Sequence, residues 1–208
     1  MYIPTYSEVT NLPLINSFIE EHPFGTLITN LNNELNANHY PFLIENSSEL
    51  TLWTHLAKSN PQWKHFEQTS DCLIIFTGPH SYISPTHYEN QMNVPTWSYT
   101  AVHLNCCAQI VEDTSEQKNL MKRLVHYFES KNGTNWNYQL PEEQHERLLN
   151  SILWLKFKIK KVEGKFKLSQ NRDKVDYQRL LSEFSSRKSD NDLELLKYMR
   201  LTMPDKMK

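Results

Sequence analysis

The clearest regular pattern in this chain is a two-residue alternation of apolar and basic side chains between residues 155 and 160. Leu155, Phe157 and Ile159 are separated by single lysines. Because successive side chains of a β-strand point to opposite faces of a sheet, this spacing predicts a strand. We expect one face of that strand to be buried and the other to contact water, which is typical of an antiparallel sheet.

Other segments are rich in β-forming residues and are bounded by turn-like stretches. The predicted strands are residues 24–29, 36–44, 49–55, 72–77 and 96–111. The first three follow one another directly, separated by Asn-Leu-Asn-Asn and Glu-Asn-Ser-Ser, which indicates an antiparallel meander. A small barrel is the simplest way to protect the edges of such a sheet.

Helices are predicted around this sheet from apolar residues with helical spacing and from capping residues. Their predicted positions are 11–21, a short helix opened by Asn60 and Pro61, 116–130, a helix begun by Pro141, and the charged tail that follows a polar turn after Gly164. The sequence therefore predicts an α+β fold, an antiparallel sheet with peripheral helices. Leu193, Leu196 and Met199 of the tail are expected to pack on a partner subunit.

Glycine is unusually scarce, with four glycines in 208 residues against a usual level of about 7%. Each one stands alone, which excludes a G-x-G-x-x-G turn and a P-loop, since both need clustered glycines around phosphate. A phosphorylated ligand would have to be held mainly by side chains. A chain of this length can form a single packed core.

The overall charge does not favour nucleic acid as a partner. Lys and Arg total 22 against 24 Asp and Glu, a net charge of −2, and no helix-turn-helix pattern is recognisable. One basic stripe could contact phosphates, although a solvated strand face is the simpler interpretation. That stripe consists of Lys156, Lys158, Lys160, Lys161 and Lys165.

The cellular location is expected to be cytoplasmic, with no membrane association. The N-terminus has no signal-peptide pattern, and the apolar runs are far shorter than the roughly 18 residues that a membrane span needs. Cys72, Cys106 and Cys107 form no C-x-x-C motif and are odd in number, so we expect reduced thiols. Cys106 and Cys107 should point to opposite faces of one strand.

Three segments concentrate chemically useful side chains. The first, residues 53–61, combines a lysine with small hydrogen-bonding residues at a predicted helix start, an arrangement that suits a phosphate. The second combines a predicted exposed loop, Gly78–Val94, with residues 94–99, and is rich in aromatic rings that could form a flat slot. The third is residues 165–172, which is polar. Each also has an ordinary structural interpretation, as a capped turn, as packing beneath a loop and as a solvated turn.

No catalytic residues and no metal site are predicted. His80, His87 and His103 match no metal-ligand spacing, and no acidic residue accompanies them in a ligand pattern. No Ser/His/Asp order or pair of catalytic carboxylates is defined by spacing.

Taken together, the motifs His55-Leu-Ala-Lys-Ser-Asn-Pro-Gln-Trp63, Gly78-Pro-His-Ser-Tyr-Ile-Ser-Pro85, Val94-Pro-Thr-Trp-Ser-Tyr99 and Lys167-Leu-Ser-Gln-Asn-Arg172 resemble the PaiB family, the FMN-binding negative transcriptional regulators. The resemblance begins at Met1-Tyr-Ile-Pro4 and extends through Arg172. It implies a split β-barrel related to the pyridoxamine-phosphate oxidases, which acts as a homodimer with FMN near the subunit interface. The expected organisation is a barrel domain at 1–182 and a helical tail at 183–208.

The resemblance also implies which residues bind FMN. Lys58 would face the phosphate, at a position where the family often has an arginine. Lysine keeps the positive charge, but it cannot form the two parallel hydrogen bonds that an arginine guanidinium makes to phosphate. The remaining implied positions are Thr54 and His55 at the strand end, His39 on the neighbouring strand, Asn60, Trp97 near the flavin slot, and Ser169, Gln170 and Asn171 closing the site.

Two further functions are compatible with the same residues. Because a flavin itself carries the redox chemistry, an FMN-dependent oxidase or reductase of a small molecule would need no acid-base pair from the protein. Haem binding through one of the histidines, as in some split-barrel relatives, is a weaker alternative.

Overall fold

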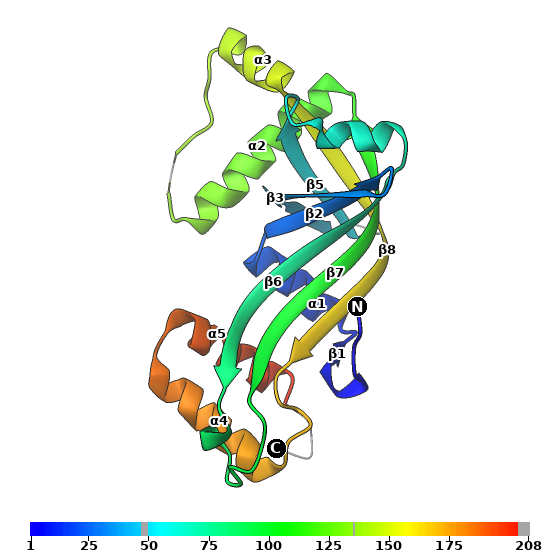
Figure 1. Cartoon of the computed structure of the whole chain (residues 1–208). Helices are drawn as coiled ribbons and strands as arrows, with labels where there is room; N and C mark the ends of the chain where they lie inside the picture. The colour runs from blue at the N-terminus through cyan, green and yellow to red at the C-terminus, as the bar shows by residue number, and fades with distance from the viewer. Residues whose placement is uncertain (47–49, 135, 204–208) are drawn as a thin grey trace. The chain divides into compact units, whose positions relative to one another are not determined.

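The structure, a computed structural model, describes residues 1–46, 50–134 and 136–203 (Figure 1). Its N-terminal half contains η1 (Thr5–Ser7), β1 (Glu8–Val9), α1 (Leu12–Glu21), β2 (Phe24–Leu31), β3 (Glu34–Pro41), β4 (Leu43–Asn46), β5 (Leu50–Ala57), η2 (Pro61–Glu67), β6 (Asp71–Ile83) and η3 (Pro85–His87). The remainder contains β7 (Thr96–Val111), α2 (Thr114–Lys131), α3 (Glu142–Ser151), β8 (Ile152–Lys167), α4 (Lys174–Arg187) and α5 (Asp190–Leu201).

Eight strands of the described part form one antiparallel sheet. Seven of them follow the order β3-β2-β6-β7-β8-β5-β4, and the eighth, β1, pairs with β8. The chain divides into two compact units. Unit 1 comprises residues 1–18, 76–103 and the described residues from 163 onward, and unit 2 comprises residues 19–75 and 104–162. Strands β6, β7 and β8 each contribute residues to both units.

Unit 2 has two apolar layers, one on each side of the strands that it contains. On one side, the buried ring of Phe157 lies 5.7 Å from the ring of Phe42 and 6.4 Å from that of Phe66, centroid to centroid. On the other side, Trp53 and Trp154 form a cluster with Leu120 and Leu124 of α2. Adjacent residues of a strand thus reach different cores, as the alternating pattern predicts.

Unit 1 is built around three buried rings. The centroid of Phe18 lies 5.0 Å from that of Phe166 and 5.5 Å from that of Tyr198, and the last two are 5.2 Å apart. Aromatic pairs at these separations each contribute about 0.5–1.5 kcal/mol beyond the burial of their surface. Since Tyr198 lies on α5, the C-terminal helix is part of the core of unit 1.

The loop predicted for Gly78–Val94 is partly wrong, because β6 continues through Ile83. Gly78 and Pro79 have the composition of a turn, but they are strand residues here. A Cβ atom at Gly78 would lie 2.6 Å from both Phe18 Cε2 and Thr100 Oγ1, so the glycine permits close packing within unit 1.

The polar turn predicted directly after Gly164 is also displaced. Strand β8 continues to Lys167, and Gly164 pairs with Val9 of β1. A Cβ atom at Gly164 would lie 2.7 Å from the backbone oxygen of Val9, so this position excludes a side chain. The turn forms at residues 168–173, where Ser169 has φ +65°.

The predicted strand at residues 36–44 is divided, since β3 ends at Pro41 and β4 begins at Leu43. Between them, the Phe42 amide donates a 2.8 Å hydrogen bond to the Pro23 oxygen. The predicted start of the strand at residue 49 falls on residues outside the described part, and the described part of β5 begins at Leu50. The other predicted helices and strands are confirmed within a few residues.

Two of the three tail residues expected at a subunit interface are buried within their own chain. Leu196 is 4% exposed and Met199 is fully buried, whereas Leu193 is 44% exposed. The expectation is wrong for Leu196 and Met199 because α5 turns these side chains into the core of unit 1.

Among the described residues, no helix combines the length and the apolar character that crossing a membrane would require.

Candidate cofactor site

The residues predicted to bind FMN fall into two groups, one in each unit. The group in unit 2 consists of His39, Thr54, His55, Lys58 and Asn60. The group in unit 1 consists of Trp97, Ser169, Gln170 and Asn171. Each group has its own geometry.

Thr54 and His55 point to opposite faces of β5. Thr54 is fully buried, and its hydroxyl donates a 2.6 Å hydrogen bond to the Pro41 oxygen. His55 pairs in register with Trp154 of β8, and the two rings lie 4.9 Å apart. The Thr54 hydroxyl therefore ties β5 to the end of β3. Because Thr54 and His55 point to opposite faces, they cannot both contact a ligand on one face of the strand.

His55 retains unused hydrogen-bonding capacity. Its Nδ1 atom and the Nε1 atom of Trp154 are both buried without a partner among the described residues. Burial lowers the pKa of His55 below the usual value for histidine, since desolvation disfavours the charged ring. His55 is therefore a neutral ring near pH 7.

Lys58 is the first residue after β5, and its main chain is held firmly. Its amide donates to the Ser151 oxygen at 2.9 Å, and its carbonyl accepts from the Trp63 indole nitrogen at 2.9 Å. The side chain itself is exposed and takes part in no ion pair with the described residues. A cation on a fixed backbone, open to solvent, fits a phosphate group.

Asn60 acts as the cap of η2 that the sequence predicts. Its side-chain oxygen accepts from the Gln62 amide at 3.0 Å, and its side-chain nitrogen donates to the Tyr40 hydroxyl at 2.8 Å. Because both ends of this side chain are engaged within the fold, Asn60 positions the turn. The helix start itself is a seven-residue 3-10 helix whose Gln62 amide is already satisfied.

Gln62 is the functional residue that sequence reasoning missed. It is fully buried; its side-chain oxygen accepts from Tyr40 at 2.9 Å and Asn38 at 3.1 Å, and its nitrogen donates to the Leu27 oxygen at 3.1 Å. The adjacent Thr29 hydroxyl is bonded to His65 of η2 at 2.8 Å. These bonds fasten η2 to β2 and β3. No spacing in the sequence distinguishes Gln62 from an exposed helical glutamine.

His39 completes the group in unit 2. It lies on β3 opposite Thr26, is exposed, and stacks on Phe24 with 6.1 Å between ring centroids. It is therefore available to a ligand or to another protein surface.

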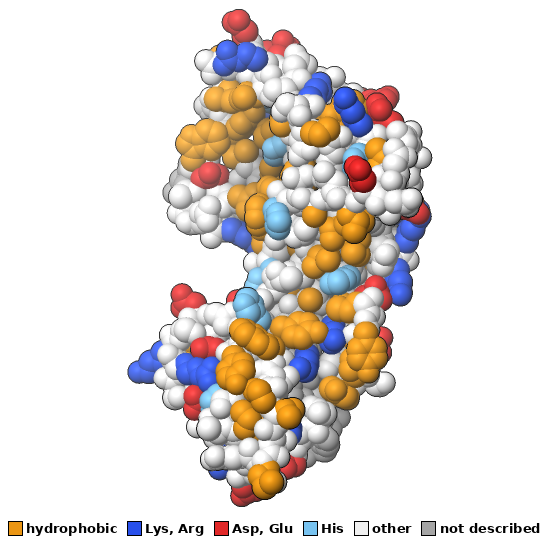
Figure 2. All heavy atoms as spheres, viewed as in Figure 1, with side chains coloured by type: hydrophobic (Ala, Val, Ile, Leu, Met, Phe, Trp, Pro, Cys, Tyr) orange, Lys and Arg blue, Asp and Glu red, His pale blue; other side chains and the backbone are white. Residues whose placement is uncertain are grey.

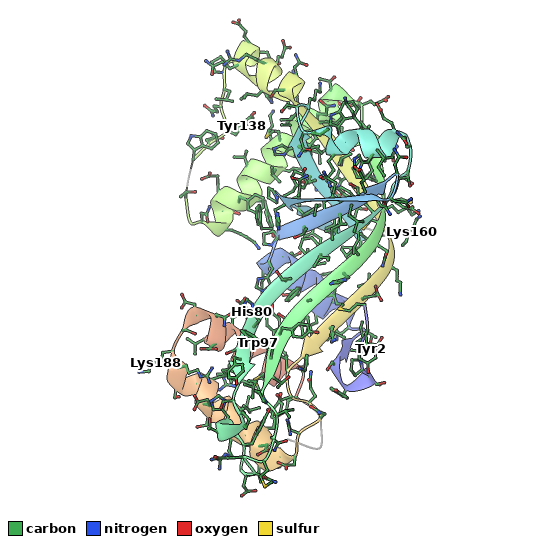
Figure 3. All side chains as sticks on the ribbon, in the orientation of Figure 1. Tyr2, His80, Trp97, Tyr138, Lys160 and Lys188 are labelled. Atoms are coloured by element: carbon green, nitrogen blue, oxygen red, sulfur yellow. The ribbon has the colours of Figure 1, made fainter. Side chains whose placement is uncertain are left out.

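In unit 1, Trp97 belongs to a small exposed aromatic cluster. Trp97 is 53% exposed, and its ring lies 6.0 Å from the rings of both His80 and Tyr82, centroid to centroid (Figure 3). Figure 2 shows hydrophobic side chains gathered over the lower ends of β6 and β7, the strands that carry these rings. An exposed aromatic cluster suits a flat ring system.

The other residues of this group form the turn after β8. Ser169 and Gln170 are buried, and Gln170 accepts from the Leu168 amide at 2.8 Å and donates to the Phe166 oxygen at 2.6 Å. The prediction of a solvated turn is therefore wrong for these two residues. Asn171 alone is exposed.

The side chains thus divide by their availability. Thr54, Asn60 and Gln170 are committed to the fold, whereas His39, Lys58, Trp97 and Asn171 are exposed. Taken separately, the group in unit 2 offers a cation that suits the FMN phosphate, and the group in unit 1 offers an aromatic surface that suits a flavin ring.

Residues 1–161 match the model of a protein family described as "Putative FMN-binding domain". The chain belongs to this family. FMN, the cofactor expected from the sequence, is the ligand of this family of FMN-binding domains.

Similar proteins agree with this assignment. The chain is 35% identical over 210 residues to "Protease synthase and sporulation protein PAI 2" of Bacillus subtilis, with 100% of this chain and 99% of that protein covered. The resemblance to the PaiB family is therefore confirmed, and this similarity includes α4 and α5. An uncharacterized protein of Aspergillus fumigatus is 29% identical, covering 88% of this chain and 90% of its own.

Solved structures confirm the fold. The flavocytochrome Anf3 of Azotobacter vinelandii matches with a TM-score of 0.60 at 10% identity, covering 79% of this chain and 72% of that chain. The FAD and heme binding protein of Mycobacterium smegmatis matches with a TM-score of 0.59 at 13% identity, covering 77% and 73%. At such identities the likeness concerns the fold alone, and the predicted split β-barrel is confirmed.

Replacing Gln62 with leucine should destabilise this FMN-binding protein by about 2–4 kcal/mol, because Tyr40 and Asn38 would lose an acceptor in a buried site. Urea unfolding of the purified protein measures the change. Gln68→Leu, the same substitution at the exposed end of η2, is the control and should change stability by less than about 0.5 kcal/mol. Equal effects of the two substitutions would contradict the anchoring role of Gln62.

Proposed function

We propose that this protein is an FMN-responsive transcriptional regulator in which Lys58 binds the FMN phosphate. The observation that carries the proposal is the fixed main chain and free ammonium group of Lys58 in a chain whose family is described by FMN binding. With only four isolated glycines, backbone amides cannot form a phosphate loop, so a side-chain cation is needed.

The regulatory role is supported by similarity along the full chain to the PAI 2 protein, whose name refers to protease synthesis and sporulation. FMN would act as the signal, either through its redox state or through its binding and release. The protein would bind and orient it. A cytoplasmic location belongs to this proposal, since Cys72, Cys106 and Cys107 are free thiols.

Direct DNA contact through the basic residues of β8 is not part of the proposal. Lys156 lies 4.7 Å above the Trp53 ring, Lys160 forms an ion pair with Asp71, and Lys165 is buried and donates to the Tyr2 oxygen. These three lysines of the stripe expected from the sequence are therefore each engaged in a different interaction within the chain. A regulator of this kind would act through another protein or through other surfaces.

A homodimer is the oligomeric state that we propose, formed through the outer face of β3, β2 and β6. On this face Ile28 lies between Ala37 and Leu73, and Thr26 lies between His39 and Ile75. Phe24 is 64% exposed and Leu35 is 75% exposed. An apolar sheet face of this kind is typical of an interface between subunits.

Binding of FMN should weaken about tenfold in Lys58→Ala, because a charge-assisted hydrogen bond to phosphate contributes about 1.5–3 kcal/mol and an exposed one lies at the low end. Quenching of flavin fluorescence during titration measures the dissociation constant. Lys64→Ala is the matched control, since Lys64 is an exposed lysine of η2 within a few residues. Trp97→Ala tests the aromatic cluster of unit 1 independently. Equal affinity of Lys58→Ala and Lys64→Ala would contradict the phosphate assignment.

Expression of this protein in a Bacillus subtilis strain that lacks its 35% identical relative should restore the transcript pattern of the parent strain. RNA sequencing at matched protein levels measures the restoration. Lys58→Ala should restore less than the unchanged protein if FMN occupancy controls the regulator. If FMN binds normally in vitro and no transcript responds, the regulatory role is wrong and a flavin enzyme becomes the better explanation.

In solution the protein should have twice the chain mass of 24.7 kDa, and Leu35→Glu should shift it toward the monomer because a charge would be buried in an apolar interface. Size-exclusion chromatography with light scattering measures the mass. Leu193→Glu changes an exposed leucine of α5 and should leave the dimer intact. A dimer that is lost only with Leu193→Glu would place the interface on the tail instead.

A further inference from the structure

Beside the three strands β6, β7 and β8 of unit 2 lies a cluster of polar and ionisable side chains that the FMN proposal does not use. Strand β7 is the middle strand of the three. The Ala108 amide donates to the Ser70 oxygen at 2.8 Å, a bond that places Asp71 opposite Cys107 and Cys72 opposite Cys106 in an antiparallel pair. Cys106 and Cys107 consequently point to opposite faces, as the sequence predicts.

The partly exposed Cys107 thiol contacts a neighbour on each side. Its sulfur donates to Asp71 Oδ1 at 3.5 Å and accepts from the Ser70 hydroxyl at 3.4 Å. From β8, the Lys160 ammonium, labelled in Figure 3, bonds the same Asp71 oxygen at 2.5 Å and lies close enough to the Cys107 sulfur to interact with it electrostatically. Cys107 therefore lies between a carboxylate and a cation on three adjacent strands.

This arrangement provides the groups that a reactive thiol requires. The thiolate is the nucleophilic form of cysteine, and a neighbouring ammonium stabilises it. The hydrogen bond to Lys160 holds the pKa of the Asp71 carboxyl below its usual value, so Asp71 is ionised near pH 7 and shares the ammonium group with the sulfur. The partly exposed sulfur is open to small molecules.

The other two cysteines lack the neighbouring carboxylate and cation on their face of the sheet, although Cys72 is partly exposed like Cys107. Cys106 is 1% exposed, and its thiol is directed to the Leu104 oxygen. The hydrogen bond with Cys106, followed by burial, raises the pKa of Cys72 far above its usual value. Both are on the face opposite Cys107, so neither can readily form a disulfide with it.

We propose that Cys107 is a site of reversible oxidation by hydroperoxides, with its reactivity set by the Asp71–Lys160 pair. The sulfur attacks one peroxide oxygen, an S–O bond forms as the O–O bond breaks, and the thiol becomes a sulfenic acid. The thiol proton is released to water, and the leaving oxygen takes up a proton from water and departs as an alcohol or as water. The sulfur is oxidised by two electrons and the peroxide is reduced by two.

The fate of the sulfenic acid follows from the position of Cys107. Because no second thiol of the chain lies on the same face among the described residues, the sulfenic acid would condense with a low-molecular-weight thiol from solution. That reaction gives a mixed disulfide and releases water. A thiol reductant would then restore the original cysteine.

The first test uses the unaltered protein and needs no variant. Native protein is treated with hydrogen peroxide and dimedone, or separately with iodoacetamide, and each cysteine is followed by peptide mass spectrometry. Cys107 should be labelled first in both experiments, Cys72 more slowly, and Cys106 only after denaturation. Labelling of Cys72 or Cys106 at an equal or greater rate would overturn the proposal.

The second test separates a tuned thiol from one that is merely exposed. Lys160→Gln leaves the Asp71 carboxylate unneutralised beside the sulfur and should slow alkylation of Cys107 about threefold, since an uncompensated negative charge disfavours the anionic nucleophile. Asp71→Asn frees the ammonium for the thiolate and should accelerate alkylation by a similar factor. Lys161→Gln removes the same charge from the opposite face of β8 and is the control. Unchanged rates in Lys160→Gln and Asp71→Asn would contradict the role of the ion pair.

Discussion

The hydrogen bonds of one buried glutamine, Gln62, are the interaction on which the candidate site depends. They connect η2 to the main chain of β2 and to side chains of β3, and Asn60 extends the same network through Tyr40. Because η2 is fastened in this way, Trp63 can hold the carbonyl of Lys58 while Ser151 holds its amide. A firmly held main chain with an exposed cation is what a protein poor in glycine can offer to a phosphate.

Much of the fold could be predicted because it depends on local patterns. Some patterns depend only on residues that are close in the sequence, and each predicts the local backbone conformation. They are the alternation at residues 155–160, the spacing of apolar residues in α1 and α2, and the Asn60-Pro61 cap. The errors arose where packing overrides composition. Gly78 and Gly164 read as turn residues, yet both are strand residues that leave space for Phe18 and for the backbone of Val9.

The candidate site was predicted less completely, and for a related reason. Motif resemblance identifies the residues of a site but not which atoms are already engaged. The hydroxyl of Thr54 and the side-chain amide of Gln170 form hydrogen bonds within the fold, whereas the side chains of Lys58 and Trp97 are exposed. Gln62 escaped detection because its importance comes from burial between elements that are distant in the sequence, and Cys107 acquires its neighbours only when three strands are assembled.

The account centres on recognition of a phosphate by Lys58, so the most direct measurement compares FMN with riboflavin, which lacks the phosphate. The dissociation constants of both ligands are measured for the unaltered protein and for Lys58→Ala. The account predicts that the unaltered protein prefers FMN and that Lys58→Ala loses about tenfold of this preference while its affinity for riboflavin is unchanged. A preference for FMN that is the same in both proteins would show that the phosphate is bound elsewhere.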